Sequence, residues 1–255
     1  MEAMYDALAP YYDELNSEID CERWADFIDR RILEFAPQFH KKGAIVCDLG
    51  CGTGAITLPL AARGYNMIGI DLSHEMLSVA AERAREAGED ILFLSADMCD
   101  FDLYGTVAVF TACLDAVNHL TEKGALDAML SRVSLFLERG GLFIFDVNTK
   151  RKFETVYRDK TYTFETDDAF VVWESDYSEK SKRADFRITL FEQQGDGSYL
   201  RSEERRSERM YTLRTLKSAA KRHGLQLLAV YDEQFEKTEE NNGETDRMHI
   251  VLSRV

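Results

Sequence analysis

The chain lacks the features of membrane and exported proteins. Its 255 residues contain no run of 18 apolar residues, the length that a membrane-spanning helix needs. Residues 1 to 6 hold neither a basic stretch nor an apolar run, which a secretory signal peptide requires. We therefore expect a cytoplasmic protein with no membrane partner. A hydrophobic content of 45%, with 11% aromatic residues, is sufficient for the core of one large domain or of a domain with an insertion.

Cysteine and histidine are too scattered to indicate a disulfide framework or a metal centre. The five cysteines, at positions 21, 47, 51, 99 and 113, show no CxxC spacing, and the five histidines form no cluster. We expect no metal ion. Cys47 and Cys51 are interpreted as small core residues of a cytosolic protein.

Positive charge is also scarce, since the net charge is −15. Such a charge disfavours general affinity for nucleic acid or anionic lipid. The exception is the segment from Arg201 to Arg222, where eight basic residues are interleaved with Glu203, Glu204 and Glu208. We interpret this segment as the solvated face of a strand and a helix, and an anionic-substrate or RNA surface is the alternative.

The most informative segment is a glycine-rich turn after a predicted strand. Residues 44 to 54 read AIVCDLGCGTG: an apolar run ends at Asp48 and is followed by Gly50, Gly52 and Gly54, before a helical pattern begins. Glycine adopts positive φ without strain and lets ligand atoms touch the main chain. Strand, glycine turn and helix in this order predict a nucleotide-like ligand.

Spacing alone leaves three interpretations of this turn. Gly50, Gly52 and Ala55 also fit the dinucleotide fingerprint, with Asp71 about 20 residues further on as the ribose acid. A turn that binds nothing is the third interpretation. Charge favours a nucleotide-like ligand with a cationic amino group over a dinucleotide. Asp48 would attract such an amino group and repel the anionic pyrophosphate of a dinucleotide.

The segment Asp48-Leu-Gly-Cys-Gly-Thr-Gly54 resembles the first motif of class I S-adenosylmethionine-dependent methyltransferases. Two further segments, 66–71 and 91–98, are similar to the second and third motifs of that family, in the same order. The resemblance covers residues 40 to 148 well, and the C-terminal segment by its architecture. It implies S-adenosyl-L-methionine as the cofactor.

The resemblance also implies roles for individual residues. Asp71 binds both ribose hydroxyls, Asp97 beside Met98 binds the adenine amino group, and Asp48 faces the amino group of the methionine moiety. The residues expected to line the cofactor are Asp48, Gly50, Cys51, Gly52, Gly54, Asp71, Leu72, Met76, Ala96, Asp97, Met98, Leu114, Asp115, Tyr5 and Tyr11.

The acceptor side is expected after the fourth strand, in the segment Cys113 to His119. Asn118 and His119 are placed near the acceptor, with His119 as a general base. The alternative for His119 is a capping or partly buried histidine without a role in proton transfer. Asp146 either belongs to the site or caps the turn that follows it.

The N-terminal segment, Tyr5 to Asp13, is similar to the opening of small-molecule methyltransferases, including amino-sugar N-methyltransferases and glycine N-methyltransferase-like enzymes. In those enzymes an N-terminal helix closes over the cofactor. The similarity implies a lid role for Tyr5, Tyr11 and Tyr12, and ordinary aromatic packing is the alternative. Because the chain has only three prolines, at positions 10, 37 and 59, it lacks the Asn-Pro-Pro-Tyr motif of exocyclic-amine nucleic-acid methylases.

Strands and helices alternate from residue 44 onward, which predicts a parallel sheet covered on both faces. The final strands, 225–235 and 247–254, are joined by a loop too short for a parallel crossover, so they should pair antiparallel. The expected fold class is α/β, a doubly wound, Rossmann-like, seven-stranded sheet with a reversed last strand. Its other strands are expected at 44–48, 66–71, 91–95, 106–112 and 141–146, and its helices at 5–15, 21–39, 55–63, 73–87, 122–138 and 212–223.

Residues 149–209 interrupt this alternation with two hairpin patterns, 161–177 and 186–206. We expect a small antiparallel β insertion at 149–209 on the acceptor side. Residues 1–148 and 210–255 then form the cofactor-binding domain with an N-terminal helical lid.

The sequence as a whole predicts a methyltransferase that moves a methyl group in line to N or O of a small-molecule acceptor, as a monomer or homodimer and without nucleic acid. Such a transfer mainly requires that the nucleophile is positioned and water excluded. Three alternatives stay open: a tRNA-modifying methyltransferase that uses the basic segment 201–222, a nicotinamide-dependent oxidoreductase, and a cofactor-binding protein without transferase activity.

Overall fold

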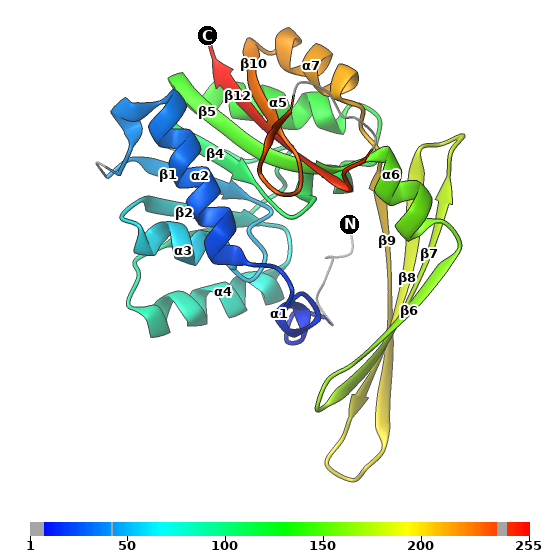
Figure 1. The fold of residues 1–255 in the computed structure, drawn as a ribbon. Helices are drawn as coiled ribbons and strands as arrows, with labels where there is room; N and C mark the ends of the chain where they lie inside the picture. The colour runs from blue at the N-terminus through cyan, green and yellow to red at the C-terminus, as the bar shows by residue number, and fades with distance from the viewer. Residues whose placement is uncertain (1–7, 42, 239–243) are drawn as a thin grey trace.

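A computed structural model gives the fold of residues 8–41, 43–238 and 244–255 (Figure 1). Tyr5, expected in the N-terminal lid, lies outside these described residues. The described chain forms two sheets. The main sheet has the strand order β11-β10-β12-β5-β4-β1-β2-β3, and the second has the order β6-β7-β8-β9.

The main sheet has the expected α/β, Rossmann-like architecture. Strands β1 to β5 are parallel where they pair, and β12 runs antiparallel to both β5 and β10. Beyond the seven expected strands, a two-residue strand, β11, extends the edge beside β10; it is too short to leave a sequence pattern. The strands are β1 Ile45–Leu49, β2 Asn66–Asp71, β3 Leu92–Ser95, β4 Val107–Ala112, β5 Leu137–Asn148, β10 Leu225–Tyr231, β11 Lys237–Thr238 and β12 Arg247–Arg254.

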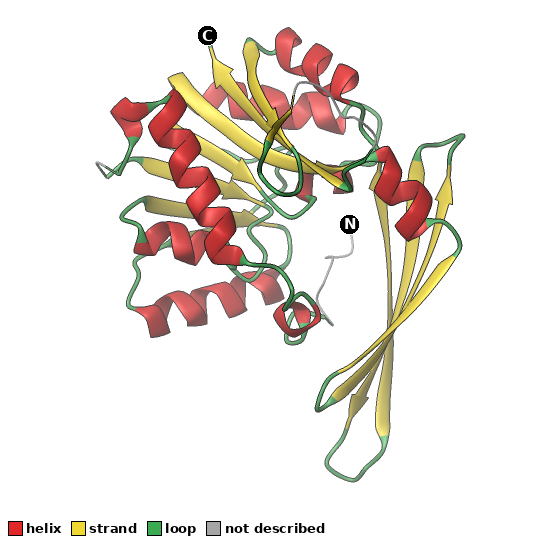
Figure 2. Ribbon diagram, viewed as in Figure 1, coloured by secondary structure: helices red, strands yellow, loops and turns green. Residues whose placement is uncertain are grey.

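Helices cover both faces of this sheet (Figure 2). The α-helices around it are α1 Tyr12–Leu15, α2 Cys21–Phe35, α3 Thr57–Ala62, α4 His74–Ala87, α5 Ala125–Phe136 and α7 Leu213–Arg222. Short helical turns occur at η1 Pro37–Phe39 and η2 Ala116–His119, and α6 Lys150–Lys152 continues into η3 Phe153–Tyr157. Within the part of the chain that the structure describes, no helix is long and apolar enough to cross a membrane.

Three helices are clearly shorter than their patterns predict. Of the described residues in the helix expected at 5–15, only Tyr12–Leu15 are α-helical, and residues 8–11 form turns. The helix expected at 21–39 ends at Phe35, because the ring of Pro37 disfavours helical backbone at the residue before it. The helix expected at 122–138 ends at Phe136. The glycine pair Gly140 and Gly141 therefore lies inside β5, where the pairing with β4 shifts register, and it marks a bulge rather than a helix end.

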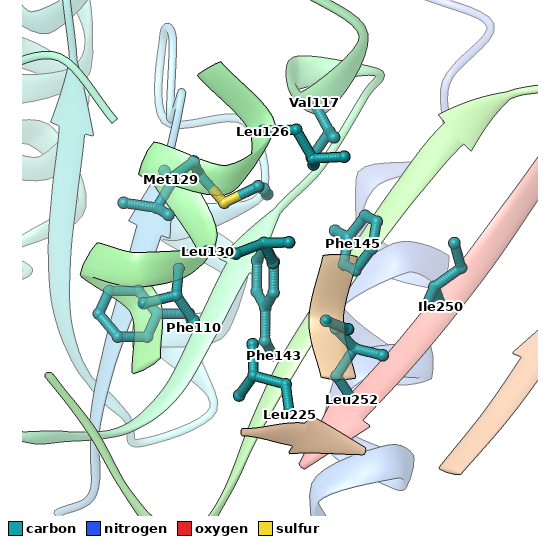
Figure 3. Close-up of a cluster of buried hydrophobic side chains, with 14 of the residues drawn as sticks. Phe110, Val117, Leu126, Met129, Leu130, Phe143, Phe145, Leu225, Ile250 and Leu252 are labelled. Atoms are coloured by element: carbon teal, nitrogen blue, oxygen red, sulfur yellow. The ribbon is translucent and has the colours of Figure 1, made fainter. Parts of the chain in front are cut away.

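The core consists of two layers, one on each face of the sheet. Alternate strand residues point to opposite faces, so Phe110 and Phe143 pack under α5 and α7 while Val109 and Ile144 pack under α2 and α3. Figure 3 shows the first layer, in which Leu130 of α5 lies over Phe143 of β5. Because both faces are buried, the carboxyl edge of the parallel strands is held on a rigid base.

The second sheet contains the predicted hairpins and extends away from the main sheet (Figure 1). Its strands are β6 Lys160–Glu165, β7 Ala169–Ser178, β8 Arg183–Gln193 and β9 Tyr199–Arg209, all paired antiparallel. One face packs Val171, Ile188 and Leu190 against Leu8 from the N-terminal segment. The N-terminal segment therefore connects the second sheet with the main one.

Candidate active site

The site lies where the strand order of the main sheet reverses. Strand β1 pairs with β2 on one side and with β4 on the other, and all three are parallel. Their carboxyl ends therefore meet at one edge, with Asp48 directly opposite Thr111. A ligand of an open α/β sheet binds outside this reversal point.

The glycine turn after β1 has the backbone that its sequence predicts. Gly50, Gly52 and Gly54 have φ angles of 68°, 54° and 78°. Residues with a side chain adopt such angles only with strain. A Cβ added to Gly52 would stand in open space, whereas one added to Gly54 would come within 2.5 Å of Leu58. Gly52 therefore permits close approach of a ligand. Gly54 was expected to line the cofactor, but it lies outside the lining of the cavity beside this turn. Its lack of a side chain instead lets α3 pack on α4.

Asp48 forms the base of the site. It is 2% exposed, and its two oxygens accept hydrogen bonds from Thr57 Oγ1 at 2.6 Å and Thr111 Oγ1 at 2.7 Å. Burial raises the pKa of this carboxyl, while the two hydroxyl groups act to lower it. The hydroxyls fix the orientation of the carboxyl group toward the cavity that it lines.

A narrow cavity runs past the glycine turn, and most of the expected cofactor residues line it. Asp71 accepts hydrogen bonds from the Gly52 backbone N at 2.8 Å and the Ser73 backbone N at 2.9 Å, which fastens the turn to the end of β2. The expected residues in this first cavity are Asp48, Gly50, Cys51, Gly52, Asp71, Leu72, Met76, Ala96, Met98 and Leu114, and Tyr12, Cys113 and His119 join them.

A second, larger cavity of about 1310 Å³ lies between the segment 119–128 and the second sheet. Leu72, Met98 and His119 line both cavities, so the two meet at these residues. Asp97, which was expected beside the cofactor, lines this second cavity, and its Oδ1 accepts a hydrogen bond from the Cys99 backbone N at 2.8 Å.

The tyrosine that lines the first cavity is Tyr12 and not Tyr11. Tyr11 instead packs against the cluster on the second sheet that contains Val171 and Leu190. Asp13 accepts a hydrogen bond from Thr53 Oγ1 at 2.7 Å and forms an ion pair with Arg83. These contacts fasten the N-terminal segment over the glycine turn and direct Tyr12 inward.

Asn118 does not have the expected position beside the acceptor. It is fully buried and absent from the lining of both cavities. Its Nδ2 donates to the Arg209 carbonyl at 2.8 Å, and its Oδ1 accepts from the Asn148 backbone N at 2.9 Å. Both ends of the amide are thus engaged with backbone, and the side chain joins the ends of β5 and β9.

Asp115 was also expected to line the cofactor, but it is absent from the lining of both cavities. It belongs instead to an ion cluster with Arg247. The Arg247 guanidinium lies 2.8 Å from Asp115 Oδ1 and contacts Asp146, whose Oδ2 accepts from the Asp115 backbone N at 2.9 Å. Burial acts to raise the pKa of Asp115, but the charges of Arg247, Lys152 and His119 together with the hydrogen bond from Arg247 outweigh it, and the pKa lies below its usual value. Burial raises the pKa of Asp146 to about 6.

One cluster of possible ligand atoms was not expected. Asp115, His119 and Glu208 each offer one atom, and these atoms lie within 4.8 Å of one another. Burial lowers the pKa of His119, which leaves its imidazole neutral at neutral pH. Glu208 had been grouped with the surface glutamates of the basic segment, yet it is 4% exposed.

The basic segment 201–222 carries compensating carboxylates. Arg201 and Arg205 pair with Glu203 at 2.7 and 3.2 Å, Arg206 pairs with Glu204 at 2.8 Å, and Arg222 pairs with Asp127 on α5 at 2.7 Å. Paired arginines offer less charge to a polyanion than the sequence suggests.

Comparison with known proteins is consistent with this geometry. A family model described as a methyltransferase domain matches residues 46–141. YqeM of Bacillus subtilis (strain 168), whose name assigns it provisionally to the methyltransferases, is 30% identical over 225 residues, which cover 88% of this chain and 87% of YqeM. An S-adenosylmethionine-dependent methyltransferase from Clostridium acetobutylicum ATCC 824 has a solved structure that is 27% identical, covers 98% of both chains and superposes with a TM-score of 0.84.

The fold is also shared with a more distant solved structure. CalS10, an amino pentose methyltransferase from Micromonospora echinaspora, superposes with a TM-score of 0.73 over 96% of both chains at 20% identity. At that identity the likeness concerns the fold.

Proposed function

Because this chain belongs to the class I S-adenosylmethionine-dependent methyltransferases and uses S-adenosylmethionine, we propose that it methylates a nitrogen or oxygen atom of a small molecule. The observation that carries the proposal is the junction of the two cavities at His119. The first cavity contains the glycine turn and the acids expected to hold the cofactor. The second offers space for an acceptor beside it.

The proposed cofactor contacts follow the sequence motifs. Asp71 binds the two ribose hydroxyls, Met98 packs on the adenine with Asp97 nearby, and Asp48 attracts the amino group of the methionine moiety. Bound S-adenosylmethionine supplies a methyl group on a sulfonium, which leaves as a neutral thioether. The remaining task of the protein is to position the acceptor and exclude water.

Enclosure of the site supports a small acceptor. Tyr12 lines the first cavity, and the same N-terminal segment is fastened to Arg83 through Asp13 and to the second sheet through Leu8. A nucleic acid would have to displace this segment. The proposed role of residues 149–209 is to select the acceptor, since β7, β8 and β9 contribute one wall of the second cavity.

His119 is the proposed acid–base residue at the junction. Its imidazole is neutral because burial lowers its pKa, so it is able to accept a proton from a hydroxyl or amine. CalS10, whose name describes an amino pentose acceptor, has the same arrangement of elements, and an acceptor of similar size suits the second cavity. Asn118 has the proposed role of holding the segment that carries His119.

The test uses cofactor labelled at its methyl group. The protein is incubated with a bacterial extract that has been separated into a metabolite fraction and a fraction of RNA and protein. We expect label in the metabolite fraction, and we expect His119→Ala to lose most of the transfer while it still binds S-adenosylhomocysteine. Label confined to RNA or protein would contradict the small-molecule acceptor, and absence of label from all fractions would contradict the proposed function as a whole.

A further inference from the structure

The turn between β4 and η2 contains two consecutive residues in a left-handed backbone conformation. Leu114 and Asp115 have φ angles of 57° and 60°, and no other two adjacent residues with side chains share positive φ in the part of the chain that the structure describes. Aspartate adopts such angles occasionally as a single residue, whereas a bulky residue such as leucine rarely does. A conformation of this kind persists only where its surroundings impose it, and such residues cluster at active sites.

This left-handed turn lies against the first cavity. Leu114 and Ala116 line that cavity, and His119, at the end of η2, lines both cavities. Ala116 also packs closely against the glycine turn, because a Cβ added to Gly50 would stand 3.0 Å from Ala116 Cβ. The backbone at 114 and 115 therefore sets where Leu114 stands in the first cavity and how close η2 comes to the glycine turn.

Asp115 is held at three points. Its backbone N donates to Asp146 Oδ2 at 2.9 Å, and its Oδ1 accepts from Arg247 Nη2 at 2.8 Å. Its carbonyl accepts from the Asn118 backbone N at 2.8 Å. Asp146 and Arg247, which we call the clamp, lie on β5 and β12 and hold the amide and the side chain of Asp115. A residue fixed at both of these groups is not free to rotate about φ.

The clamp is itself fixed in place. The Arg247 guanidinium bonds Asp146 as well as Asp115, and it lies over the Trp24 ring, 5.6 Å from the ring centroid. The side chain of Asp146 is 0% exposed and that of Arg247 is 16% exposed. The planar fork of arginine binds carboxylates with a defined direction, and loss of one partner of such a buried pair leaves an uncompensated charge. The clamp is therefore able to impose a strained backbone.

The two left-handed residues have separate tasks, which explains why neither is glycine. Glycine would adopt these angles without strain. The side chain of Asp115 is what the clamp holds, whereas the side chain of Leu114 is what lines the first cavity. Asp115, Asp146 and Arg247 line neither cavity, so they act on the site through the turn and not by contact with a ligand.

We infer that Arg247 and Asp146 are positioning residues for methyl transfer, because they impose the left-handed conformation of Asp115. Through this conformation Leu114 is placed against the cofactor, and His119 is placed at the junction of the two cavities. The inference rests on the proposed function, which takes the first cavity as the cofactor site. No proton moves through the clamp. Its contribution is a turn that has its binding conformation before the cofactor enters, so that binding does not have to order it.

The first experiment compares two replacements of Asp115 in the 255-residue chain. Asp115→Gly and Asp115→Ala both remove the carboxylate from Arg247, but only glycine adopts the left-handed angle without strain. The turn of unbound Asp115→Ala should relax, which lowers the fraction of protein that is competent to bind. We expect S-adenosylhomocysteine to bind Asp115→Ala at least ~10-fold more weakly than Asp115→Gly in calorimetry. The initial rates of label transfer to the metabolite extract should follow the same order.

Equal affinities of these two variants would overturn the positioning role, because loss of the ion pair alone affects both alike. If Asp115→Ala does not fold, Leu114→Ala and Leu114→Gly make the same comparison and leave the clamp intact. The glycine variant should again bind more tightly, and equality would again overturn the inference. A wild-type protein that binds no S-adenosylhomocysteine would instead contradict the proposed function.

The second experiment weakens the clamp. Arg247→Lys keeps the charge but lacks the fork that reaches two carboxylates, so we expect S-adenosylhomocysteine to bind at least ~5-fold more weakly. In a protein that already carries Asp115→Gly, the same change should cost less than about twofold, because glycine does not need the clamp. Equal losses in the two backgrounds would contradict an action through the turn.

Lys41 provides the matched control. It has a φ of 60° but lines neither cavity. Lys41→Ala and Lys41→Gly should both bind S-adenosylhomocysteine as the wild type does. A difference between them as large as that between Asp115→Ala and Asp115→Gly would show that relief of strain anywhere in the chain changes binding, and would overturn the assignment to the clamp.

Discussion

Asp71 offers the sharpest test of the proposed cofactor site, because its carboxylate is expected to serve the ribose and the glycine turn together. In the structure its two oxygens accept hydrogen bonds from the backbone N of Gly52 and Ser73 at 2.8 and 2.9 Å. Asp71→Ala removes these bonds and the proposed contacts with both ribose hydroxyls. Asp71→Asn keeps one acceptor oxygen and the shape of the side chain. The two variants therefore separate damage to the turn from loss of the ligand contact.

The expected magnitude follows from the number of bonds to a charged acceptor. A hydrogen bond to a charged group contributes a net ~1.5–3 kcal/mol. Two ribose contacts should therefore cost Asp71→Ala at least ~3 kcal/mol of binding free energy, a weakening of the dissociation constant of ~150-fold. Loss of the acceptor for two backbone N–H groups should also lower the free energy of unfolding by ~1–3 kcal/mol.

Calorimetry with S-adenosylhomocysteine measures the first effect, and denaturant unfolding without ligand measures the second. Asp90→Ala is the matched control, because Asp90 is exposed just before β3 and lines none of the cavities described above. Its affinity should equal that of the wild type. If folded Asp71→Ala binds within about threefold of the wild type, Asp71 does not hold the ribose and the proposed cofactor geometry is wrong.

Three further outcomes are expected. Deletion of residues 1–15 should leave a folded protein with much weaker binding of S-adenosylhomocysteine in calorimetry, because Tyr12 lines the cavity; a melting point several degrees lower with normal affinity would show that the segment only packs. Replacement of residues 149–209 by a short linker should keep cofactor binding within a few fold and abolish transfer in the labelling assay, because neither core layer of the main sheet contains a residue of this segment; surviving activity would place acceptor selection elsewhere. Burial and the charge of Asp115 raise the pKa of folded Glu208 from its usual 4.5 to about 8, against the charges of Lys152 and Arg247 and the hydrogen bond from Asn148, which act to lower it. The wild type therefore binds more protons when folded, and its free energy of unfolding should fall as the pH rises between these values. Glu208→Gln should lack this loss, which amounts to at most ~5 kcal/mol, and parallel melting curves of the two proteins from pH 5 to 9 would contradict the buried ionisation.

The sequence by itself determined the class of the fold and the residues proposed for the cofactor side of the site. Asp48, the glycines after it and Asp71 carry information that is local, because a positive φ, a strand end or a helix start depends on a few neighbouring residues. The alternation of strands and helices likewise required the parallel sheet, and the short final loop required the reversed strand. These predictions needed no knowledge of distant contacts.

The tertiary structure alone decided the acceptor side. Adjacent residues such as Tyr11 and Tyr12 point to different partners, and the choice between them depends on how the N-terminal segment lies between the two sheets. Arg247 meets Asp115 across 132 residues, and Glu208 meets Asn148 across 60. Because such contacts depend on which strands become neighbours, no local pattern distinguishes a buried carboxyl group like that of Glu208 from the surface glutamates beside it. The motifs thus identify the methyl donor, whereas the folding of distant segments onto one another forms the cavity proposed for its acceptor.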